Sequence, residues 1–136
     1  MYYGVVRNTA NELLITRRSQ QIKFPDMWEF PGGAVLSGET NIQAIIRELK
    51  EEIGIDITEI ELECKLVGKC DDDIYPYIFY VYVIDKNIDI RQVVLEEGKT
   101  VEATFKSVNG IERLIDDGKF LSGIFKNKEL LKKLGE

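Results

Sequence analysis

The segment over residues 40–53 limits the fold more than any other part of the sequence. Its apolar residues recur at three- and four-residue steps, as on one face of a helix. These residues are Ile42, Ile45, Ile46, Leu49 and Ile53. Thr40 and Gln43 form a capping-box pair at its start, and Gly54 stands where helices commonly end. The pattern therefore predicts an amphipathic helix with one apolar stripe directed at a core.

Segments rich in β-branched and aromatic residues lie on both sides of this helix. They predict strands over residues 3–7, 12–17, 61–69, 75–85 and 100–108, with further helices over 111–116 and 124–134. Because strands and helices interleave irregularly, we expect an α/β (α+β) fold with a mixed central sheet covered by helices. The length of 136 residues and the lack of a Pro/Gly/Ser-rich linker indicate a single domain, residues 1–136.

Charge and composition exclude several classes of function. The net charge is −6, and the sequence has no basic block of the kind that would indicate a nucleic-acid partner. No apolar run is long enough to span a membrane, and the N-terminus lacks the pattern of a signal peptide, so we expect a cytoplasmic protein. The sequence has no histidine, which excludes serine–histidine catalysis and imidazole zinc sites. Cys64 and Cys70 are expected to be free thiols in a reducing compartment.

Three carboxylates share one face of the predicted helix. Glu48, Glu51 and Glu52 stand at i, i+3 and i+4, where each exposed like-charge pair costs about 0.2–0.5 kcal/mol. A solvated charged face is the ordinary explanation. Here Gly33 and Glu39 precede the helix, and a glycine lets a backbone carbonyl approach an ion. Because Mg²⁺ prefers oxygen ligands and often bridges carboxylates to phosphates, this arrangement favours a metal site for a phosphorylated substrate.

The same residues carry a resemblance to a known family. Gly33, five residues, Glu39, seven residues and then "RELKEEIGI" resemble the Nudix box at every fixed position. "LLITRR" and "WEFPGG" before it are similar to the MutT-like branch. The resemblance implies an α/β/α sandwich and the hydrolysis of nucleoside diphosphates linked to another group X. It also implies Mg²⁺ as the cofactor, with Mn²⁺ as a substitute.

The resemblance assigns roles to the residues of the box. It implies that the carbonyl of Gly33 and the carboxylates of Glu51 and Glu52 contact the metal. Glu48 either binds metal or acts as the general base.

Further roles follow from the same resemblance. Glu39 supports the site or shares a second metal, and Arg47 orients the catalytic glutamates by pairing with them. A later acidic residue is expected to join the metal ligands. Glu97 is the leading candidate for it, with Glu96 and Glu102 as rivals.

Four other side chains are candidates for binding the substrate: Arg7, Arg17, Phe30 and Tyr77. Arg17 and its neighbour Arg18 close an apolar strand, for which ordinary surface charge is the alternative. Phe30, like Trp28, flanks the start of the box, where it either stacks on a base or packs in the core. Tyr77, like Tyr75, precedes an aromatic strand and either lines a base pocket or packs in the sheet.

The leading hypothesis is a Mg²⁺-dependent pyrophosphohydrolase that converts a (deoxy)nucleoside triphosphate to monophosphate and pyrophosphate. The N-terminal half resembles enzymes that remove oxidised guanine nucleotides. In those enzymes an asparagine before the last helix reads the base, whereas Ser122 and Gly123 stand there in this sequence. The base is therefore left open. One alternative is an ADP-ribose or dinucleotide pyrophosphatase, and another is a non-catalytic nucleotide-sensing module. We expect a small-molecule nucleotide as the partner of a monomer or homodimer.

Overall fold

The computed structural model describes residues 1–70 and 77–136, without the side chains of residues 60, 63–66 and 70. The strands are β1 (Tyr2–Arg7), β2 (Glu12–Arg18), β3 (Trp28–Glu29), β4 (Gly32–Gly33), β5 (Glu63–Cys70), β6 (Tyr77–Asp85) and β7 (Thr100–Ser107). The α-helices are α1 (Asn41–Ile53), α2 (Val108–Asp116) and α3 (Lys128–Lys133), and short 3₁₀ turns are η1 (Glu59–Glu61), η2 (Ile90–Gln92) and η3 (Gly123–Lys126).

The strands form one mixed sheet, as the sequence predicted. β1 runs parallel to β6, and the other pairings are antiparallel. β6 lies between β1 and β5, in agreement with the central position that its aromatic and β-branched composition indicates. β2 pairs with β7 and β3, whereas its register with β1 is limited to Arg7 and Leu13. The sheet therefore opens into two halves, β5–β6–β1–β4 and β7–β2–β3.

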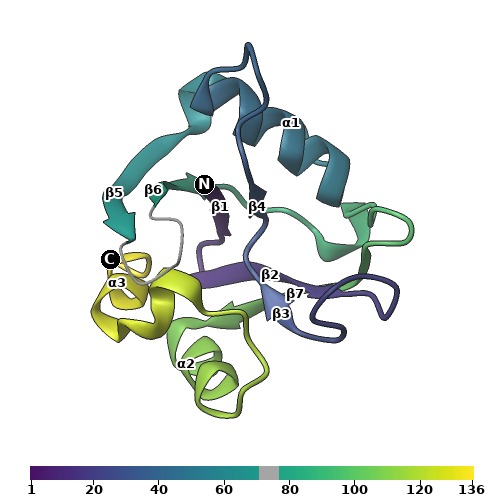
Figure 1. Ribbon diagram of the computed structural model, residues 1–136, viewed down its shortest axis with the longest axis vertical. Coiled ribbons are helices and arrows are strands. Elements are labelled where there is room, and N and C mark those ends of the chain that lie inside the picture. The colour runs from purple at the N-terminus through teal and green to yellow at the C-terminus, as the bar shows by residue number, and fades with distance from the viewer. Residues whose placement is uncertain (71–76) are drawn as a thin grey trace.

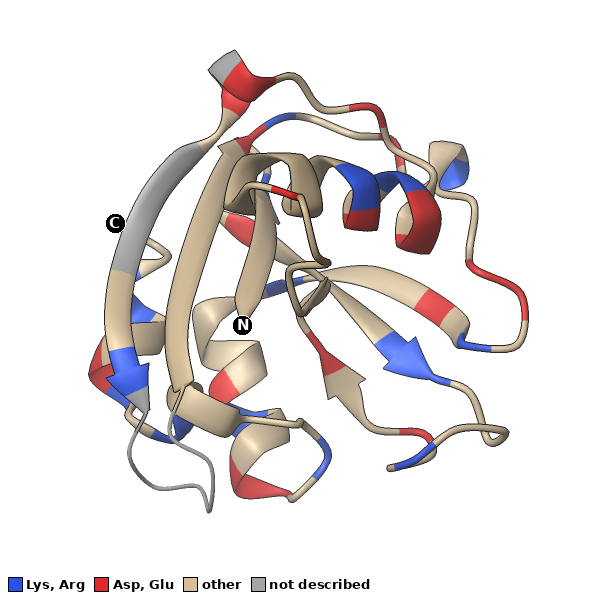
Figure 2. Ribbon diagram, turned by 45° about the horizontal axis from the view of Figure 1, so that its top comes forward, with Lys and Arg blue, Asp and Glu red and all other residues tan. Residues whose placement is uncertain are grey.

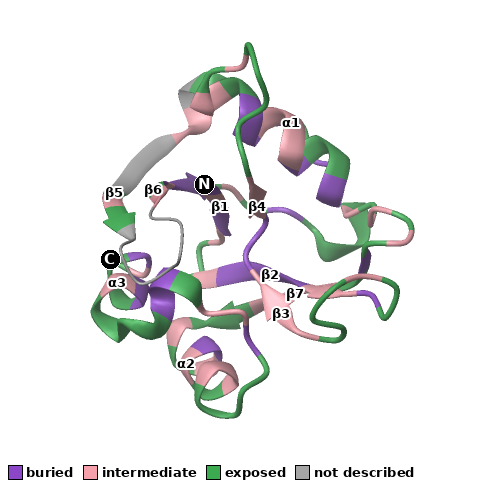
Figure 3. Ribbon diagram, viewed as in Figure 1, coloured by how far each residue is buried: buried purple, intermediate pink, exposed green. Residues whose placement is uncertain are grey.

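Helices cover both faces of this sheet, which gives three layers. In Figure 1, α1 lies on one side of the strands, and α2 and α3 lie on the other. Alternation along β1 serves both layers, because Tyr2 and Val6 join the core under α1 while Val5 joins the core under α2 and α3. The buried residues concentrate along the middle strands, and the outer helix surfaces are exposed (Figure 3).

The structure confirms the predicted helix with both of its ends. The Thr40 hydroxyl accepts a hydrogen bond from the Gln43 amide at 3.1 Å, and the Gln43 side chain accepts one from the Thr40 amide at 3.0 Å. Ile45, Leu49 and Ile53 are completely buried against the sheet. Gly54 ends the helix in the left-handed conformation, with φ 71°. The apolar stripe therefore fixes which face of α1 is left for the carboxylates.

Several boundaries differ from those predicted. Two short strands, β3 and β4, form where the sequence indicated only irregular structure, because β2 and β1 supply antiparallel partners for them. The helix predicted over 124–134 is divided into η3 and α3, since the side chain of Asn127 caps a new helix there. α2 begins earlier than predicted, directly after its N-cap residue Ser107.

Tyr75 and the thiols of Cys64 and Cys70 lie outside the described residues. Within the described parts of the chain, no helix has the length and apolar character needed to cross a bilayer.

A pair of glycine substitutions tests the docking of α1. A Cβ at residue 54 would lie 2.8 Å from the Cβ of Val94, whereas a Cβ at Gly118, with nearly the same φ of 69°, would meet nothing within 4 Å. Gly118→Ala is expected to lower the free energy of unfolding by about 1–2 kcal/mol through backbone strain alone. Gly54→Ala is expected to cost about 1–3 kcal/mol more through overpacking. Urea denaturation of both variants measures the difference, and equal losses would contradict it.

Candidate active site

The site begins where β4 lies beside the middle of α1. β4 pairs with β1, so that Gly33 is opposite Tyr2. A Cβ at Gly33 would lie 3.3 Å from the Tyr2 hydroxyl and 3.7 Å from the Glu48 carboxyl group. The buried Tyr2 side chain points its hydroxyl at Glu48, to which it donates a hydrogen bond at 3.4 Å. The strand pairing therefore brings the backbone of Gly33 next to a carboxylate of the helix.

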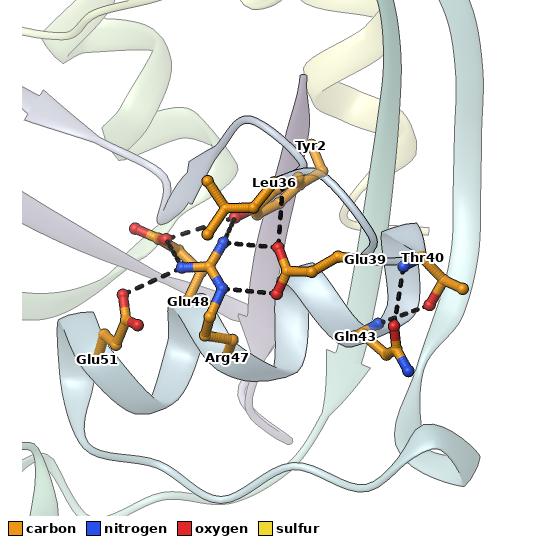
Figure 4. Close-up of polar contacts among 8 residues, drawn as sticks. All are labelled: Tyr2, Leu36, Glu39, Thr40, Gln43, Arg47, Glu48 and Glu51. Carbon is orange, nitrogen blue, oxygen red and sulfur yellow. Dashed lines mark hydrogen bonds and ion pairs between the residues drawn. The ribbon is translucent and has the colours of Figure 1, made fainter.

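Arg47 joins three carboxylates on the exposed side of this contact (Figure 4). Its guanidinium donates two hydrogen bonds to Glu39, at 2.7 and 3.1 Å, and one each to Glu48 at 3.3 Å and Glu51 at 3.1 Å. Glu39 also accepts a hydrogen bond from the Leu36 amide at 3.1 Å. The bond from Arg47 lowers the pKa of the Glu39 carboxyl. The repulsion expected along the helix is thus partly balanced by one arginine.

Glu52 is a carboxylate within the packed part of the site. Only 6% of it is exposed, and it accepts a hydrogen bond at 3.1 Å from the hydroxyl of Thr16, which is 1% exposed. Burial, together with the negative charges of Glu29 and Glu48, raises the pKa of Glu52 from 4.5 to about 8. The fold therefore holds a carboxylate in a place that disfavours its charged form.

Two acidic residues near Glu52 were not leading candidates from the sequence. Glu29 lies on β3, opposite Thr16 in register, and pairs with Arg18 at 3.0 Å. Burial and the charge of Glu48 raise its pKa, although Arg18 acts in the other direction. The pairing of β3 with β2 turns Glu29 toward the site, and the sequence showed no such strand. The one feature of the sequence that could have pointed to Glu29 is its position in "WEFPGG", directly before the box.

Among the rival acidic residues after β6, the structure brings Glu96 to the site. The Glu96 amide donates a hydrogen bond to the Glu52 carbonyl at 3.2 Å, and its carboxylate adds to the charge that raises the pKa values of Glu48 and Glu52. Glu97, which the sequence favoured, is the next residue and is exposed. Glu102 pairs with Arg17 at 3.1 Å on β7. The backbone bond to α1 thus holds residue 96 beside Glu52, whereas the role of Glu97 as a metal ligand stays a prediction.

The donor set fits a hard divalent cation. Glu48, Glu52 and Glu96 and the backbone of Gly33 offer oxygen atoms, the ligands that Mg²⁺ and Mn²⁺ take in proteins. Burial is the main cause of the raised pKa values of Glu48 and Glu52, and the charges of neighbouring glutamates add to it. Within the described residues, no three acidic side chains already form a complete ligand set, and Arg47 engages Glu48 and Glu51 instead.

A cleft of about 640 Å³ is lined by two residues of the site, Glu29 and Gly33. Phe24, Tyr77 and Phe120 contribute aromatic surface to the same cleft. This volume lies within the range typical of small-molecule sites. Figure 2 shows that the charged residues of α1 gather in the second half of that helix.

Of the four predicted substrate-binding residues, two line the cleft and two lie away from it. Tyr77 is half-buried and lines the cleft. Phe30 also borders it but is 3% exposed, with ring centroids 5.3 Å from Phe120 and 5.1 Å from Phe125, so packing is its main role.

The two arginines lie away from the cleft. Arg17 contacts Asp26 at 2.9 Å and Glu102 at 3.1 Å, while its neighbour Arg18 lines the cleft instead. Alternation along β2 explains this exchange, since successive side chains point to opposite faces. Arg7 stands at the other end of β1 from Tyr2, where it pairs with Asp85 at 2.6 Å and binds the carbonyl of Glu136. The structure therefore does not bring Arg7 to the site.

The buried carboxylate predicts a pH dependence of stability without metal. Between pH 4.5 and about 8 the folded protein holds a proton on Glu52 that the unfolded chain has lost, so the free energy of unfolding falls as pH rises. Roughly 2–4 kcal/mol is expected to be lost over this interval. Thermal denaturation in EDTA from pH 5 to 8.5 measures the slope, which Glu52→Gln should flatten. The exposed control Glu59→Gln should keep the wild-type slope, and a slope shared by wild type and Glu52→Gln would contradict the assignment.

Comparison with known proteins places this geometry in a family. The chain matches the NUDIX domain over residues 2–123. It is 46% identical over 63 residues to the 8-oxo-dGTP diphosphatase of Escherichia coli (strain K12), covering 46% of this chain and 49% of that protein. It is 38% identical over 78 residues to the 8-oxo-dGTP diphosphatase of Haemophilus influenzae, covering 57% of each. The chain thus spans about half the length of the curated relatives it matches.

A solved structure extends the likeness to the fold. The MutT protein of Methanosarcina mazei Go1 superposes with a TM-score of 0.74 at 21% identity, covering 97% of this chain and 91% of that chain. The implied α/β/α sandwich with a mixed sheet is therefore confirmed. Because the domain match covers most of the chain and includes the glycine, the arginine and the glutamates described above, this protein belongs to the Nudix family.

Proposed function

We propose that this protein is a divalent-metal-dependent pyrophosphohydrolase that converts a nucleoside triphosphate and water to a nucleoside monophosphate and pyrophosphate. One observation carries the proposal. The buried Glu52 lies among the negative charges of Glu29, Glu48 and Glu96. Glu48 lies beside the backbone of Gly33, and Gly33 and Glu29 line a cleft large enough for a nucleotide. Carboxylates at one end of such a cleft suit phosphates only when a cation lies between the two.

In this mechanism Gly33, Glu48, Glu51, Glu52 and Glu96 would hold Mg²⁺ or Mn²⁺. The bound ion supplies charge neutralisation for the phosphates and for the oxygen that departs. Glu39 is assigned a supporting role, since its carboxylate is bound to Arg47.

The residues of the chain do the remaining work. Arg47 fixes the side chains of Glu48 and Glu51, and the Thr16 hydroxyl fixes that of Glu52. Glu48 or Glu52 accepts a proton from the attacking water, as a general base. The water oxygen forms the new bond to phosphorus while the bridging oxygen leaves with the other phosphate group. The rigid helix α1 keeps these groups oriented, which reduces the entropic cost of the reaction.

The relatives suggest which substrates to test first. Three of the curated relatives are 8-oxo-dGTP diphosphatases, so oxidised and ordinary purine nucleoside triphosphates come first. Others are an RNA pyrophosphohydrolase and m7GpppN-mRNA hydrolases. Ser122 and Gly123 line the cleft. Neither has an amide side chain, so the base that is recognised stays open. We keep the prediction of a monomer or homodimer in the cytoplasm with a small nucleotide as its partner.

A substrate screen with Mg²⁺ tests the proposal directly. Common and oxidised nucleoside triphosphates, ADP-ribose, diadenosine polyphosphates and nucleotide sugars are each incubated with the protein, and the products are separated by chromatography. Monophosphate and pyrophosphate from one triphosphate are expected. Cleavage of ADP-ribose or of a dinucleotide alone would instead support the alternative pyrophosphatase. Tight binding with no product would support a nucleotide-sensing module.

Substitution of the buried carboxylate should abolish most of the activity. Glu52→Gln keeps the shape of the side chain and its contact with Thr16 but removes the negative charge, so turnover should fall by about two to four orders of magnitude. Circular dichroism should show an unchanged fold. Steady-state rates with the best substrate provide the measurement, and near-normal turnover would defeat the assignment.

Two neighbouring glutamates form a matched pair for the later metal ligand. Glu96→Gln should lower turnover at least about tenfold at limiting Mg²⁺, with partial recovery at high Mg²⁺. Glu97→Gln, which changes an exposed residue next to it, should behave like the wild type. Rates measured across a Mg²⁺ titration distinguish the two. The reverse order of effects would return Glu97 to the ligand set and exclude Glu96.

A further inference from the structure

One aromatic residue in the cleft is both exposed and conformationally constrained. Phe24 lines the cleft and is 60% exposed, the largest exposed fraction among its aromatic lining residues. Its φ is +55°, a left-handed conformation that bulky residues rarely adopt. Core packing does not explain this conformation, because most of the ring faces solvent.

The surrounding loop keeps Phe24 in this conformation through contacts on both sides. The Arg18 side chain donates a hydrogen bond to the Lys23 carbonyl at 2.7 Å, and the Asp26 amide donates one to the Arg18 carbonyl at 3.0 Å. Asp26 is itself left-handed, with φ +63°, and its carboxylate accepts hydrogen bonds from Arg17 and Gln20. The loop that joins β2 to β3 is exposed for most of its length (Figure 3). It is nevertheless anchored to the end of β2.

Backbone strain of this kind persists where neighbouring contacts enforce it, often at ligand sites. Here the enforcing residue also belongs to the site, because Arg18 pairs with Glu29 at 3.0 Å. The constrained loop thus holds an exposed aromatic ring along the same cleft as Glu29 and Gly33. A flat group that stacks on this ring would cover apolar surface that the fold leaves in water.

We propose that Phe24 is the stacking surface for the base of the nucleotide substrate. This inference rests on the proposed function, which places the phosphates at the Gly33 end of the cleft. A nucleotide has its planar base at the other end of the molecule from its phosphates, and the cleft offers Phe24 as an accessible ring for it. Stacking on an aromatic ring accepts every base, because each base has a π-face. Phe24 therefore contributes affinity for nucleosides in general, while base-edge contacts would decide among them.

The test compares substrates with and without a base. Phe24→Asn removes the ring, and asparagine tolerates the left-handed conformation, so the loop should be preserved. With Mg²⁺ and the best nucleoside triphosphate, KM should rise about tenfold while kcat stays within about twofold. With deoxyribose 5′-triphosphate, which lacks the base, Phe24→Asn and wild type should have equal constants. Phe24→Trp should restore the nucleotide KM.

A matched control replaces an exposed apolar residue elsewhere. Ile90 on η2 is 41% exposed and lies outside the cleft lining, so Ile90→Asn should leave both substrates unaffected. An unchanged KM for the nucleotide in Phe24→Asn would overturn the inference. Equal losses on both substrates would also overturn it, because they would show that the loop acts through Arg18 and Glu29.

Failure of the proposed function gives a different result. In that case the wild type hydrolyses no nucleotide, and calorimetric titration with an α,β-methylene nucleoside triphosphate and Mg²⁺ still tests stacking. Binding about tenfold weaker to Phe24→Asn than to wild type would support the inference. Equal affinities would exclude it.

Discussion

The apolar packing of α1 on the sheet buries one carboxylate against a threonine hydroxyl, and the site depends on this burial. Glu52 lies on the inner side of α1, where its neighbours on the helix, Leu49 and Ile53, are completely buried. A charged group in such a place is unfavourable unless a cation or hydrogen bonds compensate it. Thr16 supplies a hydrogen bond, and the adjacent glutamates add further negative charge rather than removing it. The apolar packing of α1 on the sheet is what holds the group there.

The carboxylates of the site fall into two sets according to their partners. Glu39 and Glu51 face Arg47, which balances them within the protein. In the part of the chain that the structure describes, Glu52 is hydrogen-bonded to Thr16 and lies close to the negative charges of Glu29 and Glu48. Glu48 belongs to both sets, because it contacts Arg47 and Tyr2 while adding to the charge around Glu52. This division explains how α1 tolerates so many acidic residues: Arg47 balances some of them. A bound cation would stabilise the others, around Glu52.

The opening of the sheet gives the site its access. β1 and β2 share little of their length, and the short strands β3 and β4 complete the two halves separately. Glu29 and Gly33 come from these two short strands, and the cleft borders both. The carboxylates are therefore held on a well-packed framework, while a loop with few buried side chains supplies Phe24 at the cleft. Rigid positioning of the reacting groups and an accessible binding surface are thus provided by different parts of the chain.

The sequence by itself determined α1, its two caps and the carboxylates on its face, because helical spacing and capping are local properties. It also determined the mixed sheet and the family, since the spacing from Gly33 to Ile55 carries both glycine and glutamate positions. Only the tertiary structure decided which residues outside this segment reach the site. Glu29 and Arg18 are brought there by strand pairing, and Glu96 by one backbone hydrogen bond to α1, whereas Arg7 is held at the far end of β1. These contacts join residues far apart in the chain, and no local pattern in the sequence specifies them.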